Sequence, residues 1–218
     1  NGAAEKRDLH TAKNGAKWSY DENTRTITFT GKSAHGSTPE KGVNALEALL
    51  EFASMFDEGC KRAYEVLCLD ENGLREMRDE TGLLTMSPDV AKIEDGALII
   101  TTDIRFPATH NVEEVRKAFE NSGVKFEFTH YQKPLYNNPE GKLISTLMNV
   151  YNRHTGRNDK AIAIGGGTYA RALKCGCGFG PEMEDEESTI HQPNEYVTFE
   201  RIRLMCEIYY ECVKELTK

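Results

Sequence analysis

Long hydrophobic runs are absent from the 218-residue sequence, and none approaches the roughly 20 apolar residues that a helix needs to cross a bilayer. An excess of positive charge is absent too, because 27 Lys and Arg stand against 35 Asp and Glu, for a formal net charge of −8. Nucleic-acid binding needs Lys and Arg concentrated on one surface. We therefore expect neither a membrane-spanning segment nor a nucleic-acid partner.

Cysteine occurs six times, but not in the patterns that bind metal or build a disulfide framework. No two cysteines form a C-x-x-C motif, and no group of Cys and His has the spacing of a structural zinc site. Cys206 and Cys212 fall on an apolar helical pattern, where a free thiol behaves as a small hydrophobic side chain. These spacings favour reduced thiols and a cytoplasmic protein.

Segments with strand-like and helix-like periodicity fill residues 18–132. Alternation with a period of two predicts strands, apolar residues three and four apart predict helices, and Thr38 followed by Pro39 is typical of a helix start. In chain order the expected elements are a hairpin at 18–30, helices at 38–56 and 60–77, strands at 82–87 and 97–107, a helix from Asn111 to Gly123, and a strand at 124–131. This order indicates an antiparallel sheet with helices packed against one face.

The pattern changes after Lys133-Pro134, and we place a domain boundary near residue 135. A helix at 141–154, an apolar strand at 161–164, a glycine-rich loop, a second short strand and a helix from Thr198 follow, an alternation that suggests α/β packing. We therefore expect an α+β chain of two parts. Residues 1–135 should form a ferredoxin-like domain, and residues 136–218 an incomplete α/β unit.

Three segments hold residue combinations suited to chemistry. His35 lies in S-A-H-G-S-T-P, a loop held between a strand and a helix, where functional groups tend to be placed. Arg105 lies in D-I-R-F-P at a strand end, and its planar fork matches a carboxylate. The third combines G-G-G-T-Y-A-R at 165–171, whose glycines allow a close backbone approach, with His191 in H-Q-P-N-E, whose neutral imidazole can ligate a metal.

Taken singly, each segment also fits a plain structural role. A loop histidine can simply cap a turn, and an Asp103–Arg105 pair on one strand face is worth about 0–1 kcal/mol. A lone His191 does not hold zinc, which normally has at least three protein ligands. The glycines are not a phosphate loop, because the G-K-[ST] ending is missing.

Together and in this order, the segments resemble the zinc-dependent aminoacylase, carboxypeptidase and dipeptidase family, and most closely its bacterial PepV-type dipeptidases. The resemblance covers residues 31–195. It is carried by six stretches: G-K-S-A-H-G-S-T-P-E-K-G-V-N-A, D-E-T-G-L-L-T, D-I-R-F-P, K-P-L-Y, I-G-G-G-T-Y-A-R and H-Q-P-N-E.

The resemblance implies a role for each segment. Residues 1–135 correspond to the lid or dimerisation domain of that family, and residues 136–218 to the C-terminal segment of its catalytic domain. The intact enzyme holds two metal ions, Zn or else Mn or Co, and hydrolyses dipeptides. The implied site residues are His35 on the oxyanion, Arg105 on the substrate's terminal carboxylate, Gly166, Gly167 and Thr168 lining the substrate pocket, and His191 as a metal ligand.

Other parts of the family pattern have no match here. The family uses an H-x-D motif, but none of the six histidines is followed two positions later by Asp, and neither Glu-Glu pair precedes His35. We therefore expect a fragment whose N-terminal catalytic segment lies before Asn1. Such a chain should bind no metal stably and should be inactive alone, unless it docks with that segment as a separate chain.

Two other functions remain open at this point. The first is an N-acyl-amino-acid deacylase, such as a desuccinylase, that uses the same metal chemistry. The second is a non-catalytic interaction module whose sheet pairs with a second copy or with a partner enzyme, because exposed strand edges favour such pairing.

Overall fold

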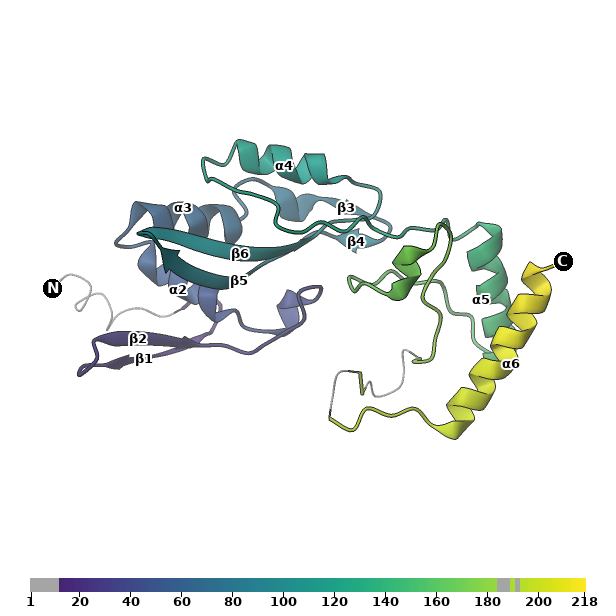
Figure 1. The fold of residues 1–218 in the computed structure, drawn as a ribbon. Coiled ribbons are helices and arrows are strands. Elements are labelled where there is room, and N and C mark those ends of the chain that lie inside the picture. The colour runs from purple at the N-terminus through teal and green to yellow at the C-terminus, as the bar shows by residue number, and fades with distance from the viewer. Residues whose placement is uncertain (1–11, 184–188, 191–192) are drawn as a thin grey trace. The chain divides into compact units, whose positions relative to one another are not determined.

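The computed structural model describes residues 12–183, 189–190 and 193–218, and it divides into two compact units (Figure 1). The first unit holds the chain up to Gln132 together with Ile164–Gly166, and the second holds Lys133–Ala163 and Gly167–Lys218. Among the helices of these described ranges, none combines the length and apolar character that a membrane crossing requires. Each unit is described by itself below.

The strands of the first unit pair as antiparallel hairpins. β1 (Lys17–Asp21) pairs with β2 (Thr26–Thr30), β3 (Arg78–Asp79) with β4 (Gly82–Leu83), and β5 (Thr85–Glu94) with β6 (Ala97–Arg105). The β5–β6 turn has positive φ at both Asp95 and Gly96, the conformation of a two-residue type I′ hairpin turn. Helices and antiparallel strands together make the described chain α+β.

The same unit also contains helical segments, some of which contact the β5–β6 hairpin (Figure 1). The helical segments are η1 (Pro39–Lys41), α2 (Ala45–Ala53), α3 (Glu58–Leu67), η2 (Leu74–Glu76) and α4 (Val112–Glu120). The expected cap of α4 is confirmed, because Asn111 and Glu114 form a reciprocal capping box.

The helix predicted from Thr38 begins later than expected. Thr38 makes no side-chain cap, and α2 starts at Ala45 with Asn44 as its N-cap. The reason is tertiary: Val43 pairs with Lys32 through backbone hydrogen bonds of 2.8 and 2.9 Å, which holds this part of the chain extended.

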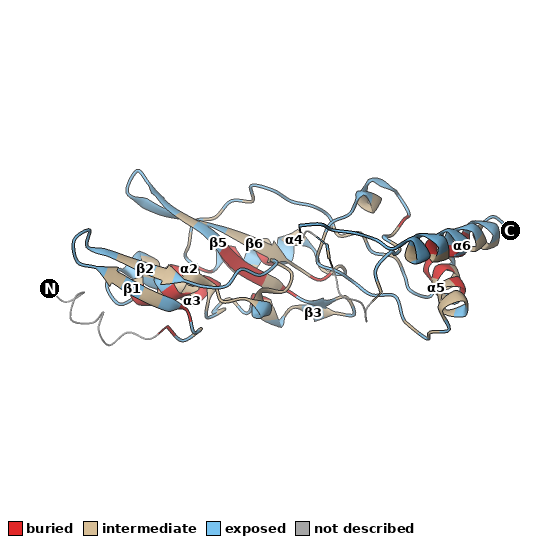
Figure 2. Cartoon of the chain, turned by 90° about the horizontal axis from the view of Figure 1, so that it is seen from below, coloured by how far each residue is buried: buried red, intermediate tan, exposed pale blue. Residues whose placement is uncertain are grey.

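The main core of the first unit is made by α3, α4 and β5 (Figure 2). Its buried side chains come from these elements and from the turns beside them: Val66, Leu67, Leu74, Leu84, Met86, Val115 and Phe119. The strand expected at 124–131 is wrong, because this segment has no strand pairing. Val124, Phe126 and Phe128 still pack against the core. The alternation therefore indicates which face of the segment is covered, and not that the segment pairs with another strand.

In the second unit two helices form the core. α5 (Lys142–Thr155) packs against α6 (Phe199–Leu216) through the buried residues Leu147, Val150, Met205, Ile208 and Cys212. The helix predicted from Thr198 is confirmed, and Thr198 caps it by accepting the Arg201 N–H. The strands expected at 161–164 and around Cys175 are wrong. Ile162 is 80% exposed, and no neighbouring strand is present in the described part of this unit to pair with it.

Candidate functional site

The loop that carries His35 leaves β2 and is closed at its base by the Lys32–Val43 bridge. His35 itself is exposed. Its Nδ1 lies 2.7 Å from the Ser37 hydroxyl and accepts the Ser37 backbone N–H at 3.2 Å. The loop is therefore ordered around the imidazole by its own residues.

Arg105 is the last residue of β6, and its side chain lies on the same face as Asp103 because strand side chains alternate. Arg105 donates from Nη2 to Asp103 Oδ2 at 2.7 Å and from Nε at 3.1 Å. Both side chains are about 30% exposed, at 30% for Arg105 and 29% for Asp103. The Asp103–Arg105 ion pair that the sequence suggested is present, and it orients the plane of the guanidinium.

Gly36 brings the histidine loop against this pair. A Cβ built on Gly36 would lie 2.5 Å from Asp103 Oδ2 and 3.3 Å from Arg105 Nη2, so only glycine fits without a shift. The Gly36 carbonyl also accepts from the Thr85 hydroxyl at 3.0 Å, and Thr85 is the residue opposite Arg105 in the β5–β6 ladder. The loop and the strand end form one cluster, defined by His35, Ser37, Asp103 and Arg105.

The first glycine of the glycine-rich loop joins this cluster. Arg105 Nη1 donates to the carbonyl of Gly165, which belongs to the first unit. A Cβ on Gly165 would lie 2.2 Å from the Ser37 Cβ. Of the predicted pocket residues, Gly166 also belongs to the first unit, whereas Thr168 lies in the second and caps η3 (Tyr169–Ala172) by accepting the Ala170 N–H at 3.3 Å.

Sequence reasoning did not select Ser37, Thr85 or Gly165 as members of the cluster. A signal for Ser37 was available, because a donor two residues after a side-chain acceptor is typical of a local turn. Gly165 lies in the glycine-rich segment that the sequence singled out, but its bond with Arg105 is a tertiary contact, and no sequence signal pointed to Thr85.

The model of Peptidase family M20/M25/M40 matches residues 15–215. The chain belongs to this family. The resemblance drawn from the six sequence stretches is thereby confirmed, and M20 peptidases are generally metal-dependent.

Curated relatives of this M20 chain include proteins named as dipeptidases. It is 29% identical over 223 residues to "Putative dipeptidase YtjP" of Bacillus subtilis, covering 96% of this chain and 48% of that protein. It is 29% identical over 212 residues to a "Putative dipeptidase" of Staphylococcus epidermidis, covering 90% of this chain and 45% of that protein. The chain thus spans about half the length of the curated relatives it matches.

The metal-binding part of the M20 prediction lies outside the described residues, because it rests on His191. Within residues 12–183, 189–190 and 193–218, no group of three or more His, Cys, Asp and Glu side chains is placed to hold a metal ion.

Burial disfavours the thiolate form at four of the six cysteines. All six are free. Burial raises the pKa of Cys68 to about 12, and it also raises the pKa values of Cys60, Cys177 and Cys212. A nucleophilic thiolate needs a lowered pKa, so these four thiols are packing residues.

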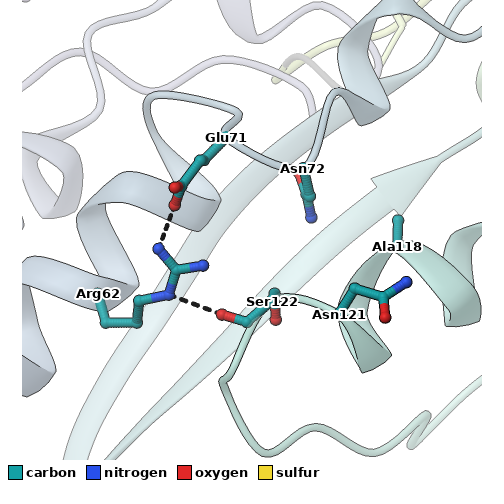
Figure 3. A pocket seen from close by; sticks show the side chains of 6 residues that line it. All are labelled: Arg62, Glu71, Asn72, Ala118, Asn121 and Ser122. Carbon is teal, nitrogen blue, oxygen red and sulfur yellow. Dashed lines mark hydrogen bonds and ion pairs between the residues drawn. The ribbon is translucent and has the colours of Figure 1, made fainter.

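A hollow of about 240 Å³ lies elsewhere in the first unit, between α3 and the end of α4 (Figure 3). Arg62 crosses it, donating to the Ser122 carbonyl at 2.6 Å and pairing with Glu71. Asn72 lines the hollow, and both atoms of its amide are buried without a partner among the described residues. The polar contacts of Arg62 in this hollow connect α3 to the chain after α4. We therefore assign the hollow a structural role.

Proposed function

We propose that this chain supplies the substrate-closing part of a metal-dependent dipeptidase, with His35 and Arg105 as its acting residues. The observation that carries the proposal is the close packing of the histidine loop on the arginine, with Gly36 between them and no room for a Cβ. Two groups suited to different ends of one small substrate are thereby held in a single cluster. The M20 membership and the names of the relatives support the same reaction.

His35 is proposed to donate a hydrogen bond to the oxygen of the scissile carbonyl as negative charge develops there. Its ring is exposed, so a substrate can reach it, while the Nδ1 edge is held by Ser37. A donor placed on a developing oxyanion contributes about 2.7–4 kcal/mol in comparable acyl-transfer sites. His35 thus acts on the transition state rather than on ground-state binding.

Arg105 is proposed to bind the terminal carboxylate of the dipeptide. Each terminal nitrogen of a guanidinium carries two N–H groups, and the contacts to Asp103 and Gly165 use one on each. The others remain for a substrate, so Asp103 orients the guanidinium without consuming all of its donors. A dipeptide whose carboxylate is positioned in this way presents its peptide bond at a fixed distance from the anchor.

The domain roles, the pocket residues and the location of the protein are also proposals. They comprise residues 1–135 as a ferredoxin-like lid, residues 136–218 as a catalytic-domain segment, Gly166, Gly167 and Thr168 as pocket residues, and a cytoplasmic location. In the intact enzyme two Zn, Mn or Co ions would polarise the carbonyl and activate water, with His191 as one ligand.

Self-pairing is a second proposal, and exposed apolar side chains on the β5–β6 hairpin favour it. Val90 is 56% exposed and Ile93 is 75% exposed, and the hairpin is two-stranded, so its outer edges offer backbone groups for pairing. We infer that a homodimer could form along this hairpin. Charged substitution of Ile93 should then reduce the mass in sedimentation, whereas it leaves a monomer unchanged.

The test of Arg105 compares a dipeptide with the same dipeptide carrying a C-terminal amide, in the dipeptidase assembled with its metals. Arg105→Gln should lower kcat/KM for the free acid by about 100-fold, an order expected for a charged contact of roughly 3 kcal/mol, and should change the amide far less. Arg203→Gln removes an arginine that is 84% exposed on α6 and serves as the control.

An equal loss on both substrates would contradict the carboxylate role. His35→Ala should lower kcat on both, because the oxyanion forms in either case. That these 218 residues alone do not hydrolyse dipeptides stays a prediction, since the sequence has no H-x-D motif. An assay of dipeptide hydrolysis with added Zn²⁺ or Mn²⁺ checks this prediction, and robust turnover would contradict it.

A further inference from the structure

Ser37 makes two contacts with the same ring nitrogen of His35. Its hydroxyl oxygen lies 2.7 Å from Nδ1, and its backbone N–H donates to Nδ1 at 3.2 Å. A side-chain acceptor that receives the N–H two residues later is the arrangement of an Asx turn, made here by an imidazole. The Thr38 N–H donates to the His35 carbonyl at 2.8 Å and closes the turn.

The backbone contact indicates which ring nitrogen of the neutral imidazole carries the proton, and the Ser37 hydroxyl is the second group that Nδ1 contacts. A backbone N–H only donates, and a ring nitrogen accepts only when it carries no proton. Nδ1 is therefore the unprotonated nitrogen, the Ser37 hydroxyl turns its hydrogen toward it, and the ring proton lies on Nε2. We propose that Ser37 is a positioning residue that holds His35 in the Nε2–H tautomer.

Contacts around the loop keep Ser37 in this place. Gly36, just before it, accepts from the Thr85 hydroxyl at 3.0 Å, and a Cβ added at Gly36 would lie 2.5 Å from Asp103 Oδ2. On its other side Ser37 lies against the backbone of Gly165. Among the described residues no hydrogen bond is made to Nε2, and His35 is exposed.

This inference rests on the proposed role of His35 and makes that role more specific. In the Nε2–H tautomer, Nε2 can donate a hydrogen bond to an oxygen on which negative charge develops. In the other tautomer the same nitrogen presents a lone pair, which repels that oxygen. Ser37 touches the protein and not the substrate, so its effect on the reaction passes through His35.

Nitrogen-15 NMR of the histidine side chains tests the inference on the 218-residue chain without a catalytic assay. In the wild type, at a pH where His35 is neutral, Nε2 should show the shift of a protonated nitrogen and Nδ1 that of an unprotonated one. Ser37→Ala removes the hydroxyl and keeps the N–H. It should lower the ratio of Nε2–H to Nδ1–H by about two- to ten-fold, the loss of one hydrogen bond.

Ser33→Ala is the matched control, because it deletes a hydroxyl two residues before His35 in the same exposed loop. It should leave the ratio unchanged, and the amide spectra of both variants check that the fold is intact. A proton on Nδ1 in the wild type overturns the inference. Equal ratios in the wild type and in Ser37→Ala overturn it as well.

Kinetics separate this inference from the proposed function. In the assembled dipeptidase, Ser37→Ala should lower kcat and leave KM nearly unchanged, as expected for a group that acts through transition-state stabilisation. If the NMR ratio shifts as expected while His35→Ala keeps full activity, the tautomer assignment stands and the proposed role of His35 fails.

Discussion

The carboxylate of Asp79 receives hydrogen bonds from two threonines. The hydroxyl and backbone N–H of Thr81 donate at 2.6 Å each, and those of Thr109 donate at 2.7 and 2.8 Å. Partial burial pushes the pKa of Asp79 upward, but the donors outweigh it and hold the pKa at about 2. This side chain joins the β3–β4 hairpin to the segment that leads into α4.

Asp79→Asn should destabilise the first unit at neutral pH by about 1–2 kcal/mol, because the charge-assisted bonds are weakened. The folded pKa lies below the unfolded value of 3.8, so the contribution is present above the unfolded pKa and is lost as the pH falls through the folded pKa. Urea unfolding at pH 7 and between about pH 4 and 2 measures it.

The wild type should therefore lose more stability than Asp79→Asn over that acid range. Asp89→Asn, which changes an exposed carboxylate on β5, serves as the control and should change the free energy of unfolding by less than about 0.5 kcal/mol. Parallel pH profiles of the wild type and Asp79→Asn would show that the four contacts carry no net stabilisation.

At the scale of elements, two asparagines start helices with different tertiary roles. Asn111 caps α4, and among the described residues its side chain bonds within the first turn of that helix. Asn44 caps α2 through the Leu46 and Glu47 N–H groups and also donates to the Pro88 carbonyl of β5 at 2.8 Å. Asn44 directly follows the bridge that closes the histidine loop.

Asn44→Ala should cost about 2–3 kcal/mol of unfolding free energy, against about 1 kcal/mol for Asn111→Ala, because it breaks a cap and leaves a β5 carbonyl without its donor. Urea unfolding compares the two. Hydrogen exchange at Lys32 and Val43 should also quicken in Asn44→Ala only. Equal losses in both variants would mean that the bond to β5 contributes nothing.

The helices α4, α5 and α6 were predictable because their signals are local. The caps at Asn111 and Thr198 and the apolar spacing of α4, α5 and α6 depend on residues a few positions apart. The strands at 124–131 and 161–164 were wrong because a strand needs a neighbour. Alternation shows which side chains share a face, but the backbone becomes a strand only where another strand supplies the ladder.

For the whole molecule, the two units have separate hydrophobic cores. Met86 belongs to the core of the first unit and is 2% exposed, while Ile208 belongs to that of the second and is 0% exposed. Each core stabilises the helices of its own unit, so a substitution that destabilises one core need not destabilise the other.

Met86→Ala and Ile208→Ala should each cost about 2–5 kcal/mol, but in different units. Hydrogen exchange with mass spectrometry should show faster exchange in α3 and α4 for Met86→Ala, and in α5 and α6 for Ile208→Ala. Faster exchange throughout the chain in either variant would show that the units unfold as one.

The sequence by itself determined the family, the helices α4, α5 and α6, and the identity of His35 and Arg105 as candidates, because motifs and caps are read from neighbouring residues. Only the tertiary structure decided what surrounds them. Gly36 meets Asp103, and Arg105 meets the Gly165 carbonyl, across long stretches of chain. Such contacts depend on which surfaces pack together, and periodicity does not specify this. That packing supports the roles proposed for His35, Ser37 and Arg105.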